Sequence, residues 1–274
     1  MNDNLNVAVI QLTSTDNITE NISQIRSLIH SIALNTDIVF LPENALFFRI
    51  NEGSTIPKFN MESSVINDVQ KLSEEASVSI HIGSLPLDRN GKTFSSSVLL
   101  TPADSPKILY DKIHLFDVDM PNRPPIRESD VFSRGESPSL FEFKNWKFGS
   151  SICYDVRFSE LYNFYAKAGA ECILIPSAFL PETGAAHWQV LLRARAIENQ
   201  SYVIAPAQSG VHTDKLGNSR RTYGHSLVVD PWGEIVVEAT TPEPQVLTVT
   251  LTKDKIDSIK TKMPMDKHRL SKFQ

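Results

Sequence analysis

The stretch that decides the fold runs from residue 147 to residue 169 and reads KFGSSICYDVRFSELYNFYAKAG. Residues 147–152 are predicted to form a strand, and residues 159–168 a helix that Gly169 ends. The short turn between them carries Cys153, which places the sulfur at the edge of the predicted sheet. A strand followed by a turn and a helix is a building unit of layered α/β domains. The stretch therefore predicts an α/β fold with a cysteine at one sheet edge.

The same alternation of short apolar runs and longer amphipathic stretches continues on both sides. Further strands are expected at residues 6–11, 37–41, 79–83, 95–100, 107–110, 139–143, 172–175, 202–207, 223–229, 235–238 and 245–250. Further helices are expected at residues 17–34, 62–76, 184–200 and 253–262. Residues 121–138 are predicted to be a long, proline-marked loop. Because no linker or repeat interrupts this order, we expect one layered α/β domain rather than two.

The composition limits the partners and the location. The 274 residues include 27 Lys+Arg and 32 Asp+Glu, a formal net charge of −5, and the basic residues are scattered. This distribution lacks the basic patch of a protein that binds nucleic acid or an anionic membrane. The apolar runs are too short for a transmembrane helix, and the first residues lack a signal-peptide pattern. Two cysteines cannot form a disulfide framework, so we expect a cytoplasmic protein.

Spacing excludes several kinds of site. The histidines and cysteines never stand at metal-ligand spacing. The sequence has no glycine-rich dinucleotide motif, no phosphate-binding loop and no G-x-S-x-G turn. With these sites excluded, acid–base and thiol chemistry are the remaining candidates for catalysis.

Four side chains are candidates for that chemistry, and each has a plain structural alternative. Cys153 stands where backbone N–H groups after a turn can face an oxyanion, although a lone cysteine is more often a buried apolar residue. Cys172, inside a predicted strand, is expected to be such a core residue. Glu43 follows an apolar strand, where a desolvated carboxylate can serve as a general base. The structural alternative is a helix N-cap or a solvated loop acid. Lys112 and Glu128, taken alone, would be interpreted as surface charges.

Taken together, these residues resemble a known family. The motifs FLPEN at residues 40–44, YDKIHLFD at residues 110–117 and SSICYDVRF at residues 150–158 closely resemble the nitrilase superfamily of carbon–nitrogen hydrolases. The resemblance covers residues 5–256, which implies a single domain there and a C-terminal tail over residues 257–274. The stretches at residues 187–200 and 223–233 are most similar to the Nit branch of the superfamily. The resemblance also implies a four-layer αββα sandwich that pairs through helices into a homodimer or a higher homo-oligomer.

The same resemblance implies roles for the site residues. Glu43, Lys112 and Cys153 would form a catalytic triad, with Glu128 beside the lysine. Glu43 would accept the thiol proton, and the thiolate would attack an amide carbonyl. Lys112 and the backbone N–H of Tyr154 would stabilise the oxyanion. Ammonia would then leave, and water activated by Glu43 would hydrolyse the thioester. This chemistry requires no metal or organic cofactor.

The Nit branch implies two classes of small amide substrate. One is the deaminated form of glutathione, which we favour because residues 191–200 and 205–208 are closer to the enzymes that use it. The other consists of the ω-amides 2-oxoglutaramate and 2-oxosuccinamate. Both classes carry carboxylates, so the site needs a cation, for which Arg157 is the candidate, with Tyr154 and Phe179 as further substrate-binding residues. Arg193 and Arg195 point to different faces of one helix, and which lies nearer the site stays open.

A protein of another class is the alternative. A non-catalytic binding or redox-sensing protein could also retain the thiol, but it would not need a base, an ammonium and a thiol together. Among the other polar and aromatic residues, Trp188 is expected to be a core or dimer contact, His187 a hydrogen-bonded residue at a helix start, and His225 a satisfied core group.

Overall fold

The computed structural model describes residues 4–51, 53–119 and 125–270. Two six-stranded sheets form its centre. The first has the order β16-β1-β2-β3-β4-β5 and consists of β1 (Asn4–Gln11), β2 (Ile38–Phe40), β3 (Ser79–Arg89), β4 (Lys92–Leu100), β5 (Lys107–Asp111) and β16 (Gln245–Thr252). The second has the order β15-β14-β11-β10-β9-β8 and consists of β8 (Leu140–Phe143), β9 (Trp146–Ser150), β10 (Cys172–Leu174), β11 (Tyr202–Ala205), β14 (Leu227–Val229) and β15 (Ile235–Glu238).

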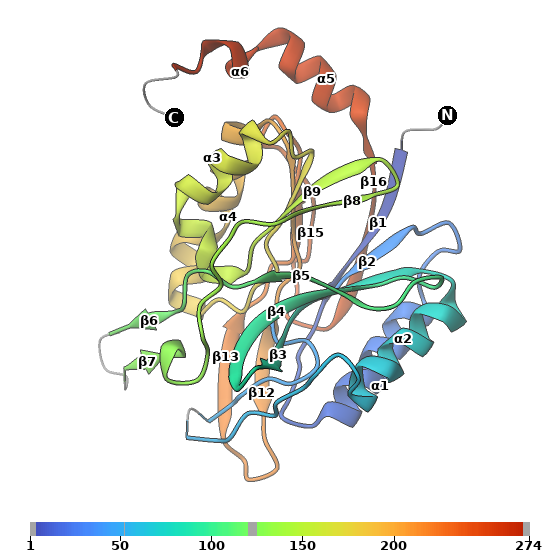
Figure 1. The fold of residues 1–274 in the computed structure, drawn as a ribbon, viewed down its shortest axis with the longest axis vertical. Coiled ribbons are helices and arrows are strands. Elements are labelled where there is room, and N and C mark those ends of the chain that lie inside the picture. The colour runs from blue at the N-terminus through green and yellow to red at the C-terminus, as the bar shows by residue number, and fades with distance from the viewer. Residues whose placement is uncertain (1–3, 52, 120–124, 271–274) are drawn as a thin grey trace.

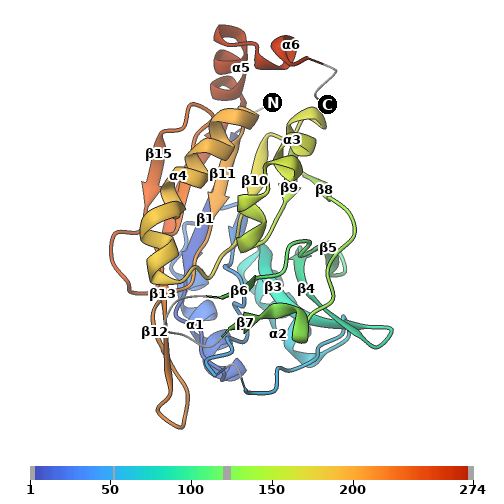
Figure 2. The ribbon, with the colours of Figure 1, turned by 90° about the vertical axis from the view of Figure 1, so that its left-hand side faces the viewer.

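Helices cover the outer faces of both sheets. Figure 1 shows α1 (Ile18–His30) and α2 (Ser64–Ala76) on one side of the molecule and α3 (Ser159–Lys167) and α4 (Pro181–Asn199) on the other, with the sheets between them. In Figure 2, α3 and α4 lie side by side on the face toward the viewer. This arrangement is the expected αββα sandwich of an α/β protein.

The apolar core has three layers, which match the spaces between the four layers of the sandwich. Strand β1 shows how one sequence serves two of them. Val7 and Val9 point into the cluster between the sheets, whereas Ala8 and Ile10 point into the cluster under α1 and α2. Alternate residues of a strand face opposite sides of its sheet, and both sides are buried here, so an almost continuous apolar run results.

Shorter elements complete the chain. Two small sheets pair β6 (Asp117–Val118) with β7 (Ile126–Arg127) and β12 (Ser209–Thr213) with β13 (Ser219–Tyr223). The 3-10 helices are η1 (Glu128–Asp130) and η2 (Cys153–Arg157), and the last helices are α5 (Lys253–Lys262) and α6 (Met265–His268). None of the helices in the described ranges is long and apolar enough to cross a lipid bilayer.

The predicted end of α1 and the facing ends of β3 and β4 are wrong, because local turns end or extend these elements. Helix α1 ends at His30 rather than at residue 34, since the Ser31 hydroxyl donates to the Leu28 carbonyl (2.6 Å) and closes the last turn. Strands β3 and β4 are longer than predicted. Their pairing continues as far as Arg89 and Lys92, across a two-residue turn in which Asn90 and Gly91 both have positive φ.

The region after α4 was also predicted incompletely. The strand expected at residues 223–229 is two strands, because Gly224 and His225 have φ values of 77° and 59° and break the extended chain. The β12–β13 hairpin was missed, since its residues are mostly polar and carry no apolar alternation. Helix α4 begins at Pro181 rather than at residue 184, with proline in the first turn. The loop predicted at 121–138 contains β7 and η1, while residues 121–124 lie outside the described ranges.

Candidate active site

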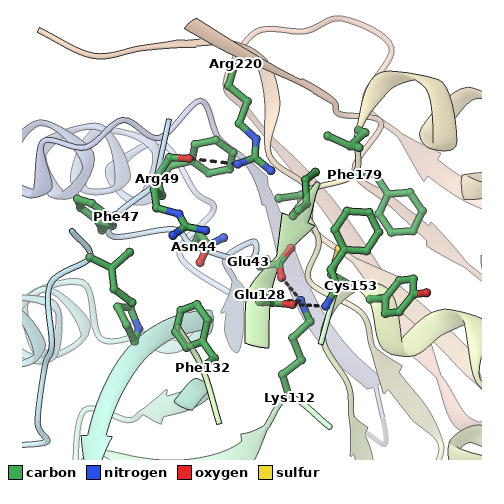
Figure 3. Close-up of a pocket in the computed structure, with 18 of the residues that line it drawn as sticks. Glu43, Asn44, Phe47, Arg49, Lys112, Glu128, Phe132, Cys153, Phe179 and Arg220 are labelled. Atoms are coloured by element: carbon green, nitrogen blue, oxygen red, sulfur yellow. Dashed lines mark hydrogen bonds and ion pairs between the residues drawn. The ribbon is translucent and has the colours of Figure 1, made fainter. Parts of the chain in front are cut away.

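Four predicted side chains lie together where strands end. Glu43 follows β2 and Lys112 follows β5, so both come from the first sheet. Cys153 opens η2 directly beyond the end of β9 in the second sheet, and Glu128 opens η1. Figure 3 shows Glu43, Lys112, Glu128 and Cys153 around one opening. The group is therefore assembled from both sheets.

Lys112 is the centre of this group. Its Nζ lies 2.8 Å from Glu43 Oε1 and 2.9 Å from Glu128 Oε1. The Lys112 and Glu43 side chains are almost fully buried, at 2% and 5% exposure. The other oxygen of Glu128 accepts the backbone N–H of Phe116 at 2.6 Å. One buried ammonium is thus shared by two carboxylates, which keeps it charged and fixed in position.

Cys153 is held in an unusual backbone conformation. Its φ of 49° lies in the left-handed region, which costs a residue other than glycine on the order of 1–3 kcal/mol. Its N–H donates to the Pro176 carbonyl at 3.0 Å, and the Cys153 side chain lines the same cavity as Glu43 and Lys112. This turn directs the sulfur toward the Glu43–Lys112 pair.

Burial dominates the titration of the group. Burial and the adjacent Glu43 raise the pKa of the Cys153 thiol well above its usual range, and the Lys112 ammonium offsets part of this rise. Burial disfavours the charged form of Lys112, but Glu128, Glu43 and Cys153 outweigh it and raise the lysine pKa well above its usual value. Burial also raises the pKa of Glu128, against the opposing effect of Lys112. The resting thiol is therefore protonated at neutral pH, and attack requires a base.

A second buried carboxylate, Asp155, joins the Lys112 and Cys153 segments. One oxygen of Asp155 accepts the Ile152 N–H at 2.9 Å and the Tyr110 hydroxyl at 2.8 Å. The other accepts the His114 backbone N–H at 2.9 Å and the His114 Nδ1–H at 2.7 Å. Tyr110 and His114 flank Lys112 in sequence, so Asp155 ties the lysine segment to the turn of the cysteine. Asp155 was not predicted from the sequence as a site residue, although it lies within the SSICYDVRF motif.

The three predicted substrate-binding residues lie beside the thiol. Arg157 in η2 donates to His187 Nδ1 at 3.1 Å. Its guanidinium stands 5.6 Å from the ring centroid of Tyr154 and 5.4 Å from that of Phe179. Arg157, Tyr154 and Phe179 all line the same cavity as Cys153. His187 is hydrogen-bonded as predicted, but it lies in the second turn of α4, because that helix begins earlier than expected.

The cavity is lined by more residues than the sequence predicted. Its open space, including the mouth to solvent, is about 860 Å³. The lining residues that the sequence did not predict include Asn44, Phe47, Phe48, Arg49, Phe132 and Arg220. Asn44 directly follows Glu43 in the FLPEN motif, which was a usable signal. Arg220 lies on the β12–β13 hairpin that the sequence did not predict.

Several other residues are structural. Arg195 is buried and donates to the Val156 carbonyl at 3.0 Å, and Arg193 donates to the Gly233 carbonyl at 2.8 Å. Neither arginine lines the cavity. Neither is therefore a candidate for binding a substrate there. Cys172 and Trp188 are buried in the core, as predicted.

His225 is less buried than predicted, and the described residues form no metal site. Its side chain is 35% exposed rather than fully in the core, because it pairs with Glu238 at 2.9 Å near the surface. In the described ranges, His, Cys, Asp and Glu residues form no cluster of three or more that could hold a metal ion.

Comparison with known proteins gives one consistent family. A family model described as carbon-nitrogen hydrolase matches residues 6–261. A deaminated glutathione amidase of Synechocystis sp. is 35% identical over 273 residues, which cover 96% of this chain and 97% of the relative. The omega-amidase NIT2 of Mus musculus is 36% identical over 267 residues, which cover 96% of this chain and 94% of the relative.

Solved structures agree with this result. The NitFhit protein of C. elegans superposes with a TM-score of 0.86 at 31% identity, over 100% of this chain, which spans 66% of that protein. Nit3 of Saccharomyces cerevisiae, described as a member of branch 10 of the nitrilase superfamily, gives a TM-score of 0.81 at 28% identity, over 96% of this chain and 95% of that one. The chain therefore belongs to the carbon–nitrogen hydrolase family, within the Nit branch of the nitrilase superfamily, and is a hydrolase of carbon–nitrogen bonds other than peptide bonds.

Proposed function

We propose that the protein is a cysteine-dependent amidase that cleaves a small carboxylate-bearing amide through a thioester, with deaminated glutathione as the preferred substrate. One observation carries the proposal. The buried Lys112 ammonium joins Glu43 to Glu128 at 2.8 and 2.9 Å, and Cys153 lines the same cavity, close enough for Glu43 to raise the pKa of its thiol. A base, a cation and a nucleophile thus stand within reach of one reacting carbonyl.

Acylation begins with proton transfer from Cys153 to Glu43. Before the transfer, Glu43, Lys112 and Glu128 sum to a charge of −1 when both carboxylates are ionised. Passing the thiol proton to Glu43 leaves the charge of the buried site unchanged, whereas losing it to solvent would add a second negative charge. The sulfur attacks the amide carbon, and Lys112 with the Tyr154 N–H stabilises the oxyanion. Glu43 then protonates the amide nitrogen, the C–N bond breaks and the amine leaves.

Deacylation uses the same residues, with water as the nucleophile and the sulfur as the leaving group. A water molecule loses a proton to Glu43 and attacks the thioester carbon, with the oxyanion again beside Lys112. The C–S bond breaks, and the sulfur recovers its proton from Glu43. The sum of both halves is amide plus water to carboxylic acid plus amine, and the protein returns to its starting state.

Two of the candidate substrates share one acyl group. Deaminated glutathione and 2-oxoglutaramate both carry the 4-carboxy-4-oxobutanoyl group, so both would place the same thioester on Cys153. They differ in the amine that leaves, which is cysteinylglycine in the first case and ammonia in the second. Release of ammonia, as expected from the sequence, therefore applies to the ω-amide only. The carboxylate of the shared acyl group is assigned to Arg157, which stands beside Tyr154 and Phe179 in the cavity.

Assembly and location are part of the same proposal. The outer surface over α4 and β15 exposes Val190, Ile197, Trp232 and Val236. Covering these apolar side chains in a homodimer would remove them from water, and light scattering of the wild type and of a Val190→Asp variant tests this. We also propose a single catalytic domain over residues 5–256 and a cytoplasmic location.

A direct test measures 2-oxoglutarate, the acid that both substrates release. Purified protein should form it from deaminated glutathione, and Cys153→Ala should abolish the reaction while Cys172→Ala should not. Mass spectrometry after rapid quenching should find the acyl group on Cys153. If the wild type turns over neither substrate, or if Cys153→Ala remains active, the proposal is wrong. A thiol-bearing binding or sensing protein would give the first of these results.

A further inference from the structure

The choice between the two substrates cannot be made at the acyl end of the cavity. This point rests on the proposed function, under which both substrates form one thioester. Any contact with the acyl group, including that of Arg157, then contributes equally to both reactions. Discrimination has to come from contacts with the leaving group. Cysteinylglycine differs from ammonia most strongly in its free carboxylate, so the relevant feature is a further cation in the cavity.

Two cationic residues of the cavity have no part in the proposed chemistry. Among the described residues that line it, the positive side chains are Arg49, Lys112, Arg157 and Arg220. Lys112 is enclosed by two carboxylates, and Arg157 stands at the thiol. Figure 3 shows Arg49 and Arg220 across the opening from Lys112 and Cys153, with the Arg49 guanidinium near Asn44. The cavity therefore has a reacting end and a separate arginine end.

The arginine end is built on a rigid support. Arg220 donates from Nη1 to the Arg49 carbonyl at 3.3 Å, and its guanidinium carbon stands 5.4 Å from the ring centroid of Phe48. The Phe48 ring also stacks against His212, with ring centroids 4.0 Å apart. The arginine is thus fixed by both the backbone and an aromatic surface.

His212 anchors this stack without adding charge. It is fully buried, its Nδ1–H donates to the Ser14 carbonyl at 2.7 Å, and its Nε2 accepts the Thr222 hydroxyl at 2.7 Å. Burial lowers its pKa to about 4, so the ring is neutral at physiological pH. The β12–β13 hairpin therefore holds Arg220 in position through the uncharged rings of Phe48 and His212. His212 adds no positive charge to that of the two arginines.

We propose that Arg220 and Arg49 bind the terminal carboxylate of the leaving group, and that they make the protein select an amide of a carboxylate-bearing peptide over a primary amide. A guanidinium has five N–H donors, so an arginine with protein partners still offers donors to a ligand carboxylate. Such paired donors suit a carboxylate better than a single ammonium does.

The first test uses the wild-type protein. Its substrates are deaminated glutathione and the analogue whose glycine carboxylate is replaced by a carboxamide, which has the same acyl group and the same amide to be cleaved. We expect kcat/KM to be about 10- to 100-fold higher for the free carboxylate, the effect of a hydrogen-bonded charge. A preference below threefold overturns the proposal.

The second test uses Arg220→Gln and Arg49→Gln. Each should lose most of the carboxylate preference, with kcat/KM for deaminated glutathione reduced about 10- to 100-fold and that for 2-oxoglutaramate nearly unchanged. Arg221→Gln is the matched control, since Arg221 is the next residue of β13, is exposed and does not line the cavity, yet its replacement removes the same charge. Equal losses on all substrates, or no loss with deaminated glutathione, overturn the proposal.

The two tests separate this inference from the proposed function. A wild-type protein without activity on either substrate would refute the amidase proposal itself. An active wild type that ignores the terminal carboxylate would leave the amidase standing and refute only the arginine subsite. If one arginine variant does not fold, the other variant and the wild-type comparison still decide.

Discussion

Replacing Asp155 by Asn tests whether a buried carboxylate positions Lys112 in the proposed active site. Asp155 is fully buried and accepts four hydrogen bonds, two at each oxygen. Asparagine keeps one oxygen and presents an NH₂ group to the other two donors. Each hydrogen bond to a charged group contributes about 1.5–3 kcal/mol, and removing a buried charge returns part of the loss. We expect the free energy of unfolding to fall by about 3 kcal/mol.

The same change should slow the reaction. Asp155 holds Tyr110 and His114 on either side of Lys112, so losing two contacts lets the ammonium shift against Cys153. A misplacement of about 1 Å costs on the order of 100-fold in rate, so kcat should fall by about that factor while KM changes little. Urea unfolding and steady-state kinetics measure both effects, with Tyr110→Phe as a milder control that removes one donor. A stability change below about 1 kcal/mol together with kcat within threefold of the wild type would refute the reasoning.

Three further predictions concern the thiol. Glu43→Gln should lower kcat by about 10²–10⁴-fold, the contribution of a general base, yet it should move the pH midpoint of Cys153 alkylation by iodoacetamide downward, because a negative neighbour that raises the thiol pKa is gone. An unchanged or higher midpoint would contradict this. Cys153→Gly should be about 1 kcal/mol more stable to urea than Cys153→Ala, since only glycine adopts a φ of 49° without strain, and equal stabilities would contradict the strain. Finally, the thiol keeps its proton in the folded state above its unfolded pKa of about 8.5, so it lowers the free energy of unfolding by about 1.4 kcal/mol per pH unit above that pH. Cys153→Ser should have a slope shallower by that amount between about pH 8.5 and 10, and identical slopes would rule out the raised pKa.

The sequence predicted the strand ends at the site but not how they meet. Glu43, Lys112 and Cys153 each follow an apolar run, so their places at the ends of β2, β5 and β9 could be inferred from pattern alone. Nothing in that pattern says that two different sheets bring them together. Their meeting was expected only from the resemblance to the nitrilase superfamily, because the packing of two sheets is a property of the whole chain.

The arginine end of the cavity illustrates what the sequence could not predict. Residues 209–223 form a hairpin whose buried side chains include His212 and Thr222, which satisfy each other by a hydrogen bond. Prediction from apolar periodicity fails where a strand buries polar groups in pairs, so Arg220 was not recognised as a site residue. Asp155 was missed for a related reason, since two of its three partner residues, Tyr110 and His114, come from a distant segment.

The pairing of β1 with β16 has a consequence for biosynthesis. Asn4 pairs with Thr252, so β1 leaves the ribosome long before β16, the strand that completes its pairing. Until then one side of β1 has unpaired backbone groups beside an apolar sequence, which is a surface that aggregates. Nascent chains should therefore depend on chaperones until β16 has left the ribosome, and the first sheet should be complete only then.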